Sequence, residues 1–392
     1  MKKFLSSLFM ALFAIVAFAG TSEKRAVITS PECKHWVDSV IKTMSLEDQV
    51  AQLFFVNLFP NPEANATIKS LIGKYKMGGI LFYRGELDDY VSAINYARES
   101  AEIQPFIAFD GEWGLQMRIK DTPRFPHNIC MGAVQDYNIA YEYGKEVARE
   151  LKAIGVNINF APVVDVNLNP DNPVIGYRSF GENPENVAKY ACAYADGLED
   201  GGVMAVTKHF PGHGDTSADS HKELPVVTHD YKTLTNIDLL PFAKFIAHGG
   251  NGIMVGHLNV PALDKSRTPA SLSYPITTEL LKEKMGFDGI IFTDALGMRG
   301  ARLVGKSNCV EALKAGADVL LNPEMPVQDF KQVVKAVKKN VISKKDIEMR
   351  CRKVLAYKYA FGVQDCKPVR NEGIKEIIEA PQAYATAQKI AN

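Results

Sequence analysis

The sequence predicts an α/β fold, a (β/α)8 TIM-like barrel, from three observations. Eight short apolar runs recur along the 392 residues, segments with helical character separate them, and most of the runs end in a polar side chain. Strand and helix alternating eight times is the pattern of a closed barrel of parallel strands. An open, doubly wound parallel sheet is the alternative that the same alternation allows.

The apolar runs are the expected strands, and in chain order they are 52–57, 79–83, 106–110, 157–160, 204–209, 253–257, 290–294 and 318–321. The segments 140–154 and 187–200 are examples of the helices expected between them. Runs such as Gly289-Ile290-Ile291-Phe292 are continuously apolar, as expected of strands that are covered on both faces. In a barrel, the polar residues that end such strands meet at one face, which is where active sites lie.

One domain is expected to hold the barrel, at residues 27–361, and a C-terminal helical tail is expected at 362–392. Residues 1–19 resemble a cleavable signal peptide, because a short basic head precedes an apolar run that ends in a small-x-small cleavage pattern. The mature protein is therefore expected to be secreted or periplasmic, with no stable membrane insertion. An uncleaved membrane anchor is the alternative.

The composition narrows the class of partner. The chain has 45 basic and 45 acidic side chains, so it lacks the positive charge expected of a nucleic-acid-binding protein. A hydrophobic share of 46% excludes a disordered chain. The six cysteines have no metal-binding spacing. A disulfide between Cys33 and Cys366, near the two ends of the predicted barrel, is one hypothesis; six thiols without a disulfide is the favoured alternative.

The most specific segment, 208–221, leads from the end of a predicted strand into a loop rich in Gly and Pro. Residues two apart in an extended segment point the same way, so Asp219 can hydrogen-bond His221 and fix its tautomer. An imidazole held in this way suits proton donation to a leaving group. The histidines of this segment as metal ligands, or an ordinary polar loop, are the alternatives.

Three further clusters follow other predicted strands. Asp294 ends a fully apolar strand, where a carboxylate is costly to bury unless it is paired or functional. Asp110 ends another strand, and the nearby Trp113 offers either a surface for a sugar ring or an ordinary core contact. Arg178 can form forked hydrogen bonds to polar oxygens.

The motifs occur in the order Phe-Asp-Gly-Glu (109–112), Asn-Phe-Ala-Pro-Val-Val-Asp-Val (159–166), Arg-Ser-Phe-Gly (178–181), Lys-His-Phe-Pro-Gly-His-Gly (208–214) with Asp-Ser-His (219–221), and Thr-Asp-Ala-Leu-Gly-Met (293–298). Together they resemble glycoside hydrolase family 3, and in particular its β-N-acetylglucosaminidase branch. The resemblance extends over residues 46–321, and the Asp-Ser-His loop is its most specific part.

The resemblance implies roles for individual residues. Asp294 corresponds to the nucleophile, and Asp219 with His221 corresponds to the acid/base pair. The residues that correspond to sugar-binding positions are Asp110, Arg118, Arg178, Lys208 and His209, with His257 beside them. Neither a metal nor an organic cofactor is expected.

The implied reaction is a double displacement with retention, in which Asp294 forms a glycosyl-enzyme while His221 protonates the departing oxygen. Gly212 and Gly214 are expected to let the loop that carries His221 move. The substrate would be a terminal β-linked N-acetylglucosamine of cell-wall fragments or other glycans. The alternatives are a β-glucosidase, a phosphorylase that uses phosphate in place of water, and a catalytically silent glycan-binding protein.

Two departures from the family pattern affect the rim of the expected site. Leu115 replaces a family arginine, and Ala295 follows Asp294 where a second aspartate is common. These changes bear on the range of substrates more than on the mechanism.

Overall fold

The structure is a computed structural model that describes residues 23–134, 136–218 and 223–391. The predicted signal peptide at 1–19 lies outside these residues, and so do Asp219 and His221. Within the described residues, no helix is long and apolar enough to cross a lipid bilayer.

Eight parallel strands form the centre of the molecule, and each overlaps one of the predicted apolar runs. They are β1 (Phe54–Leu58), β2 (Gly79–Phe82), β3 (Phe106–Phe109), β4 (Ile158–Asn159), β5 (Met204–Phe210), β6 (Gly252–Val255), β7 (Ile290–Thr293) and β8 (Leu320–Leu321). Neighbours in sequence pair from β1 to β7, and β1 also pairs with β8. A bridge between Phe292 and Val319 brings β7 to the start of β8. The sheet is thus a nearly closed barrel, and the predicted fold class is confirmed.

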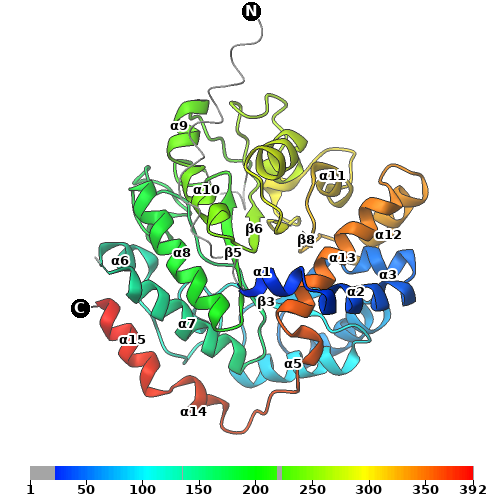
Figure 1. Cartoon of the computed structure of the whole chain (residues 1–392), viewed down its shortest axis with the longest axis horizontal. Coiled ribbons are helices and arrows are strands. Elements are labelled where there is room, and N and C mark those ends of the chain that lie inside the picture. Colours follow the sequence, from blue (N-terminus) through cyan, green and yellow to red (C-terminus); the bar gives the residue numbers. More distant parts are fainter. Residues whose placement is uncertain (1–22, 135, 219–222, 392) are drawn as a thin grey trace, which may run out of the picture.

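Helices surround the strands as an outer ring (Figure 1). The α-helices are α1 (Glu23–Ile28), α2 (Pro31–Thr43), α3 (Leu46–Ala51), α4 (Asn65–Ile68), α5 (Leu87–Ser100), α6 (Asn128–Ala133), α7 (Tyr137–Ala153), α8 (Pro184–Asp200), α9 (Tyr231–Asn236), α10 (Leu240–Ala247), α11 (Asn308–Ala315), α12 (Pro326–Lys338), α13 (Lys344–Ala360), α14 (Ile374–Ile378) and α15 (Pro381–Ala391). The 3₁₀ helices are η1 (Pro62–Ala64), η3 (Leu115–Met117), η4 (Gly176–Arg178), η5 (Ala270–Leu272), η7 (Arg299–Ala301) and η8 (Val363–Asp365). The π-helices are η2 (Lys69–Lys74) and η6 (Pro275–Lys284).

Local sequence explains where the longer helices begin. The side chains of Ser30, Asn183 and Ser343 accept hydrogen bonds from backbone N–H groups in the first turns of α2, α8 and α13. Such N-caps satisfy donors that have no partner within the helix. Proline in the first turn of α2 and α8 adds to this, because its fixed φ suits that position.

Aromatic side chains fill the interior of the barrel. The ring of Phe292 in β7 lies 5.7 Å from that of Phe55 in β1 and 5.5 Å from that of Phe160, which follows β4. All three side chains are fully buried. Rings from such distant strands can meet only across the interior, so the barrel is a packed core rather than a pore.

The first helix closes the end of the barrel opposite the predicted active site. The Arg25 guanidinium in α1 donates to the carbonyl oxygens of Gly249 and Gly250, which precede β6, and pairs with Asp288, which precedes β7. These partners all lie at the amino ends of strands. Asp288 is therefore placed at the opposite end from the carboxyl ends of the strands.

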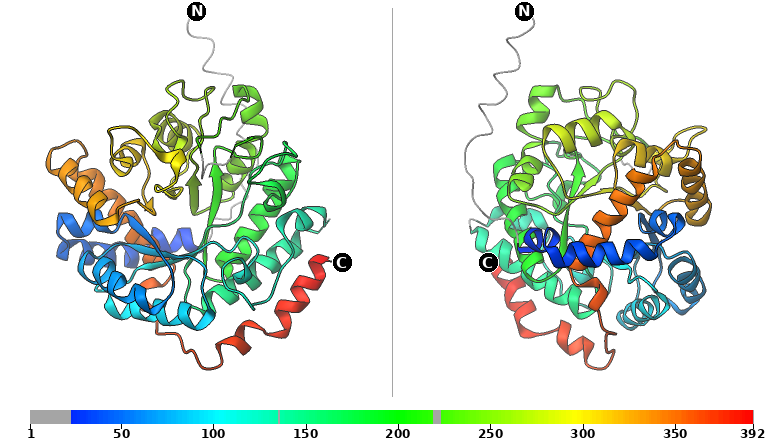
Figure 2. Two further views of the ribbon diagram at one scale, coloured as in Figure 1. Left: turned by 180° about the vertical axis from the view of Figure 1, so that it is seen from behind. Right: turned by 45° about the vertical axis from the view of Figure 1, so that its right-hand side comes forward.

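The C-terminal segment packs along the outside of the helical ring, next to α7 (Figure 2). Arg149 of α7 donates to the carbonyl oxygen of Ile378, and Lys389 of α15 pairs with Glu142 of α7 at 2.5 Å. Earlier in the segment, Asn95 of α5 exchanges two hydrogen bonds with the backbone of Val369. The tail is thus tied to the barrel by side chains from two helices.

The hypothesis of a disulfide between Cys33 and Cys366 is wrong for this structure. All six cysteines fall within the described residues, and each is a free thiol. The Cys33 sulfur lies 3.7 Å from the carbonyl oxygen of Ala356, whereas the Cys366 sulfur lies 3.4 Å from that of Gly362. These two thiols therefore have separate partners.

Candidate active site

A cavity of about 670 Å³ opens at the carboxyl ends of the strands. Its wall includes Asp110 after β3, Lys208 and His209 within β5, and Asp294 after β7. Arg178 reaches the same cavity from η4 in the loop after β4. Side chains that are up to 184 positions apart in sequence therefore share one wall because parallel strands end on one face.

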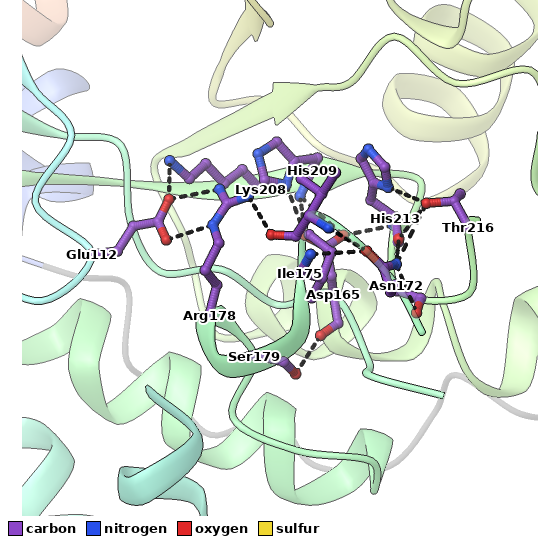
Figure 3. Close-up of polar contacts among 12 residues, drawn as sticks. Glu112, Asp165, Asn172, Ile175, Arg178, Ser179, Lys208, His209, His213 and Thr216 are labelled. Carbon is purple, nitrogen blue, oxygen red and sulfur yellow. Dashed lines mark hydrogen bonds and ion pairs between the residues drawn. The ribbon is translucent and has the colours of Figure 1, made fainter. Parts of the chain in front are cut away.

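Charged side chains on one side of the cavity form a connected network. The Lys208 ammonium lies 3.1 Å from Asp110 and 2.8 Å from Glu112. The Arg178 guanidinium donates to both Glu112 oxygens, at 2.8 and 2.7 Å (Figure 3). Arg118 donates to the second oxygen of Asp110 at 2.6 Å. The network therefore holds charged donors and acceptors in fixed directions along the cavity wall.

Electrostatics keep the two carboxyl groups of this network ionised. Burial raises the pKa of Glu112, but the charges of Arg178 and Lys208 lower it more, so the pKa lies well below the ordinary value. Burial also raises the pKa of Asp110, and here Lys208 and Arg118 bring the net value below the ordinary one. Three cations therefore face two ionised carboxylates in this network.

A second carboxylate group organises the histidines of β5 and the following loop. Asp165 is fully buried and accepts a hydrogen bond from the His209 ring at 2.7 Å and from the backbone N–H of His213 at 2.7 Å. Burial raises the pKa of Asp165, yet His209 and His213 lower it below its usual value overall. Asp165 thus fixes the direction of the His209 ring and the start of the loop (Figure 3).

Asp294 stands at the end of β7, partly exposed to the cavity. The backbone N–H of Ala295 donates to its Oδ1 at 2.7 Å. Burial raises the pKa of the carboxyl group, but His257, His209, the Ala295 N–H and Lys208 together lower it below the ordinary value. The group is therefore an ionised carboxylate at neutral pH, which is the state that a nucleophile needs.

The structure places most of the predicted site residues together. Six of them line the cavity, namely Asp110, Arg118, Arg178, Lys208, His209 and Asp294. Asp219 and His221 lie outside the described residues. Trp113 lies near this region but packs edge-on against His127, with ring centroids 4.7 Å apart, and is not part of the cavity wall.

His257 is the predicted sugar-binding residue that the structure places elsewhere. Its side chain is fully buried below the cavity, and Nε2 lies 2.9 Å from the carbonyl oxygen of Ala295, while Nδ1 lies 2.7 Å from Ser271. His257 is therefore not among the residues that line the cavity, and its part in sugar binding stays a prediction. The ring supports the backbone beside Asp294 and contributes to the low pKa of that carboxyl group.

Two residues that organise the site were not assigned roles from the sequence. Glu112 and Asp165 both lie in the motifs that carry the family resemblance, and both are buried. A buried carboxylate needs a cation or several donors. That rule, applied to the Phe-Asp-Gly-Glu motif, would have pointed to a partner for Glu112, although only the structure shows that Arg178 and Lys208 share it.

The expectation that Gly212 and Gly214 let the loop move is not supported at these two positions. A Cβ on Gly214 would lie 1.8 Å from the carbonyl oxygen of Val166, and one on Gly212 would lie 2.7 Å from Asp238. Gly212 also has φ +129°. Both glycines therefore allow close packing of the first part of the loop.

The histidines of this region have partners other than a metal ion. His209 pairs with Asp165, and the Nδ1 of His213 lies 2.5 Å from Thr216. Among the residues that the structure describes, no group of three or more His, Cys, Asp or Glu side chains is arranged to hold a metal. His221, the third histidine of the segment, is not part of that set.

A buried carboxyl group lies in α7, outside the set of residues that line the cavity. Glu150 of α7 is fully buried, and in the described part of the chain neither of its side-chain oxygens has a hydrogen-bond partner. A Cβ on Gly114 would lie 3.4 Å from its Oε2. Burial raises the pKa of Glu150 from 4.5 to about 8; the charge of Glu146 adds to the rise, and the charge of Arg149 only partly opposes it. The residue is therefore protonated at neutral pH.

This pKa predicts a pH-dependent stability. Between pH 4.5 and 8 the unfolded chain releases the Glu150 proton and the folded one keeps it, so the folded state loses stability as the pH rises. Compared with wild type, Glu150→Gln should gain about 4 kcal/mol between pH 5 and pH 9, measured by urea unfolding. Glu142→Gln, on the exposed face of the same helix, serves as control. An equal difference from wild type at both pH values would contradict the buried, protonated state.

Comparison with known proteins identifies the family to which the chain belongs. The pattern that defines the "Glycosyl hydrolase family 3 N terminal domain" matches residues 45–357. The chain belongs to glycosyl hydrolase family 3. The family resemblance of the sequence motifs is thus confirmed, and the chain is a glycoside hydrolase by membership of this family.

Relatives within the family are named as hexosaminidases. The chain is 37% identical over 282 residues to β-hexosaminidase A of Pseudoalteromonas piscicida, a match that covers 65% of this chain and 47% of that protein. It is 36% identical over 258 residues to a β-hexosaminidase of Nitrosomonas eutropha, covering 62% and 72% of the two chains. The chain thus spans about half the length of the first relative.

A solved structure shows the same fold over most of the chain. The family 3 β-N-acetylglucosaminidase of Paenibacillus sp. str. FPU-7 superimposes with a TM-score of 0.83 at 32% identity. The match covers 89% of this chain and 68% of that one. The architecture around the site is therefore that of a known family 3 enzyme.

Proposed function

We propose that the protein is a retaining exo-β-N-acetylglucosaminidase that releases terminal β-linked N-acetylglucosamine through a covalent intermediate on Asp294. The observation that carries the proposal is the position of this ionised carboxylate in one cavity with the charged network. A pyranose ring held by Asp110, Arg178 and Lys208 can present its anomeric carbon to Asp294. The names of the relatives at 36–37% identity support N-acetylhexosamine as the sugar.

The proposed steps combine the position of Asp294 with the role that the sequence motif assigns to His221. The Asp294 carboxylate attacks the anomeric carbon, the bond to the leaving-group oxygen breaks, and that oxygen takes a proton from His221. Water then gives a proton to His221 and attacks the same carbon, which frees Asp294 with net retention. The assignment of Asp219 and His221 rests on the Asp-Ser-His motif, since both residues lie outside the described part of the chain.

Leaving-group dependence tests the acid role of His221. Compared with wild type, His221→Ala should lose about 10²- to 10⁴-fold in kcat/KM on a chitobiose-like substrate, whose leaving group is poor, because general acid catalysis typically contributes that much. The loss should be much smaller on a dinitrophenyl glycoside, whose leaving group needs no proton. Equal losses on both substrates would argue against an acid role.

Turnover of aryl glycosides by the purified protein tests the function itself. Faster hydrolysis of the aryl N-acetylglucosaminide than of the aryl glucoside is the expected result. The opposite preference would identify a β-glucosidase, and binding of both without turnover would identify a glycan-binding protein. Added phosphate distinguishes a phosphorylase, because the product would then be a sugar 1-phosphate.

We also propose that the protein is exported and acts on cell-wall fragments or other glycans outside the cytoplasm. The proposal rests on the basic head, the apolar run and the small-x-small pattern within residues 1–19. N-terminal sequencing of the protein from the cells that make it should begin after residue 19. A chain that retains residue 1 in the cytoplasmic fraction would contradict export.

A further inference from the structure

We propose that His213 donates a hydrogen bond from Nε2 to the carbonyl oxygen of the 2-acetamido group, and so selects N-acetylglucosamine over glucose. The inference deepens the proposed function, on which it rests, because it assigns a substrate-specificity role to a residue of the same cavity. His213 lines the cavity wall beside Asp294 and His209.

Backbone contacts fix the position of His213. Its N–H donates to Asp165 at 2.7 Å, and its carbonyl oxygen accepts from the Asn172 side chain at 2.8 Å. The residue is therefore held both by the carboxylate that orients His209 and by the loop after β4. Figure 3 shows His213 beyond His209, on the side away from Glu112.

The contacts of the ring determine which nitrogen carries the proton. Nδ1 lies 2.5 Å from the Thr216 hydroxyl. The Thr216 hydroxyl also lies 3.1 Å from the His213 carbonyl oxygen, to which it can donate. Asn172 already donates to that carbonyl oxygen at 2.8 Å, and the contact with Nδ1 is the shorter of the two for Thr216, so we assign the hydroxyl proton to Nδ1. Nδ1 then accepts a hydrogen bond, and in the neutral ring the single proton resides on Nε2. Asn172 Nδ2, 3.4 Å from the Thr216 oxygen, supports this arrangement.

The Nε2 atom is the feature of His213 that calls for a ligand. His213 is only 2% exposed, and within the described residues Nε2 has no hydrogen-bond partner. Burial lowers the pKa of the ring to about 4, so it remains neutral at the pH of the assays. A buried donor without a partner is costly, and a ligand oxygen in the cavity would satisfy it.

The position of the His213 ring suggests which part of the sugar its Nε2–H would meet, namely the substituent on carbon 2. The ring centroids of His213 and His209 lie 6.0 Å apart, and the Asp294 charge also acts on the His213 ring. Carbon 2 is the ring atom next to the anomeric carbon that Asp294 would attack. A donor near the nucleophile and outside the Glu112–Arg178–Lys208 network is therefore suited to the substituent on that carbon. In N-acetylglucosamine this substituent ends in a carbonyl oxygen, which is a stronger acceptor than the hydroxyl of glucose.

The test compares two substrates on the same variant. The measured quantity is the ratio of kcat/KM for an aryl N-acetylglucosaminide to that for the matching aryl glucoside. Loss of one hydrogen bond should lower this ratio about tenfold in His213→Leu. Where glucoside turnover is too slow to time, the inhibition constants of the two free sugars give the corresponding ratio.

A second variant and a matched control keep the test decisive. Thr216→Val leaves the imidazole in place but removes the hydroxyl that holds the proton on Nε2. The substrate ratio should therefore fall in this variant too. If His213→Leu does not fold, the ratio measured for Thr216→Val decides the test. His127→Leu, whose ring packs between Trp113 and Tyr177 outside the cavity wall, should keep the wild-type ratio. The proposal would be overturned if the ratio stayed at the wild-type value in both His213→Leu and Thr216→Val. This includes the case in which kcat/KM falls equally on the two substrates.

Failure of this inference can be told apart from failure of the proposed function. If the wild type hydrolyses the N-acetylglucosaminide and the ratio is insensitive to His213, only the role of His213 is lost. If the wild type hydrolyses neither substrate, the proposed function has failed. Binding of N-acetylglucosamine and glucose to wild type and His213→Leu, measured by calorimetry, then still tests the selectivity of His213.

Discussion

Replacing Asp294 by alanine should lower kcat/KM for an aryl N-acetylglucosaminide by about 10³- to 10⁵-fold, because the variant lacks the carboxylate that forms the proposed covalent intermediate. The carboxylate is ionised and lies in the cavity, held by the Ala295 N–H. The loss should appear mainly in kcat, since the sugar-binding network is left intact. Steady-state rates of wild type and variant measure the effect.

Rescue by azide distinguishes a lost nucleophile from a general loss of structure. In Asp294→Ala the space left by the carboxylate can admit azide, which would attack the anomeric carbon from the same side as Asp294. The product of a β-glycoside would then be the α-glycosyl azide. Full activity of Asp294→Ala, or a β-azide as the product, would show that another residue is the nucleophile. Asp288→Ala, at the opposite end of the barrel, should retain activity and serves as a matched control.

Glu112→Ala is expected to have the largest effect on stability. The Glu112 side chain is completely buried and pairs with Arg178 and Lys208, whose side chains are 17% and 4% exposed. Removing one partner of a buried ion pair typically costs about 3–5 kcal/mol, because the remaining charges lose their compensation. Urea unfolding should show a loss of this size, and activity should fall as the direction of Arg178 and Lys208 is lost.

The pH dependence separates the charge of Glu112 from its volume. Since the pKa of Glu112 in the folded state is below 4.5, its ionisation stabilises the fold above that pH, and this contribution is lost as the pH falls through the folded-state pKa. The difference in stability between wild type and Glu112→Gln should therefore shrink under acid conditions. Glu324→Ala, which breaks an exposed pair with Arg302, should cost less than about 1 kcal/mol. A Glu112→Ala protein as stable as Glu324→Ala would contradict the role of the network.

The fold could be predicted closely because its signals are local. Each strand is a short apolar run, such as β7 at Ile290–Thr293, and a strand covered on both faces needs no information from distant parts of the chain. The ends of these runs also located the cavity residues, since parallel strands end on one face of a barrel. Asp110, Lys208 and Asp294 were found in this way.

The parts that could not be predicted depend on contacts between distant loops. His257 ends a predicted strand in the same manner as Asp294, yet packing under Ala295 buries it below the cavity. Whether a side chain at a strand end points into the barrel mouth or beneath it depends on the pleat and on neighbouring loops. The pairing of Glu112 with Arg178 spans 66 residues and has no local signal. For the same reason, sequence proximity of Cys33 and Cys366 to the chain ends did not imply a disulfide.

Mass spectrometry of a trapped intermediate tests the central claim most directly. A 5-fluoro-N-acetylglucosaminyl fluoride should form the glycosyl-enzyme quickly and hydrolyse slowly, because the ring fluorine destabilises both transition states and the fluoride is a good leaving group. The account predicts one added sugar per chain, carried by the proteolytic peptide that contains Asp294 and absent from Asp294→Ala. A sugar attached to any other residue, or full turnover of ordinary substrates with no covalent sugar at all, would contradict it.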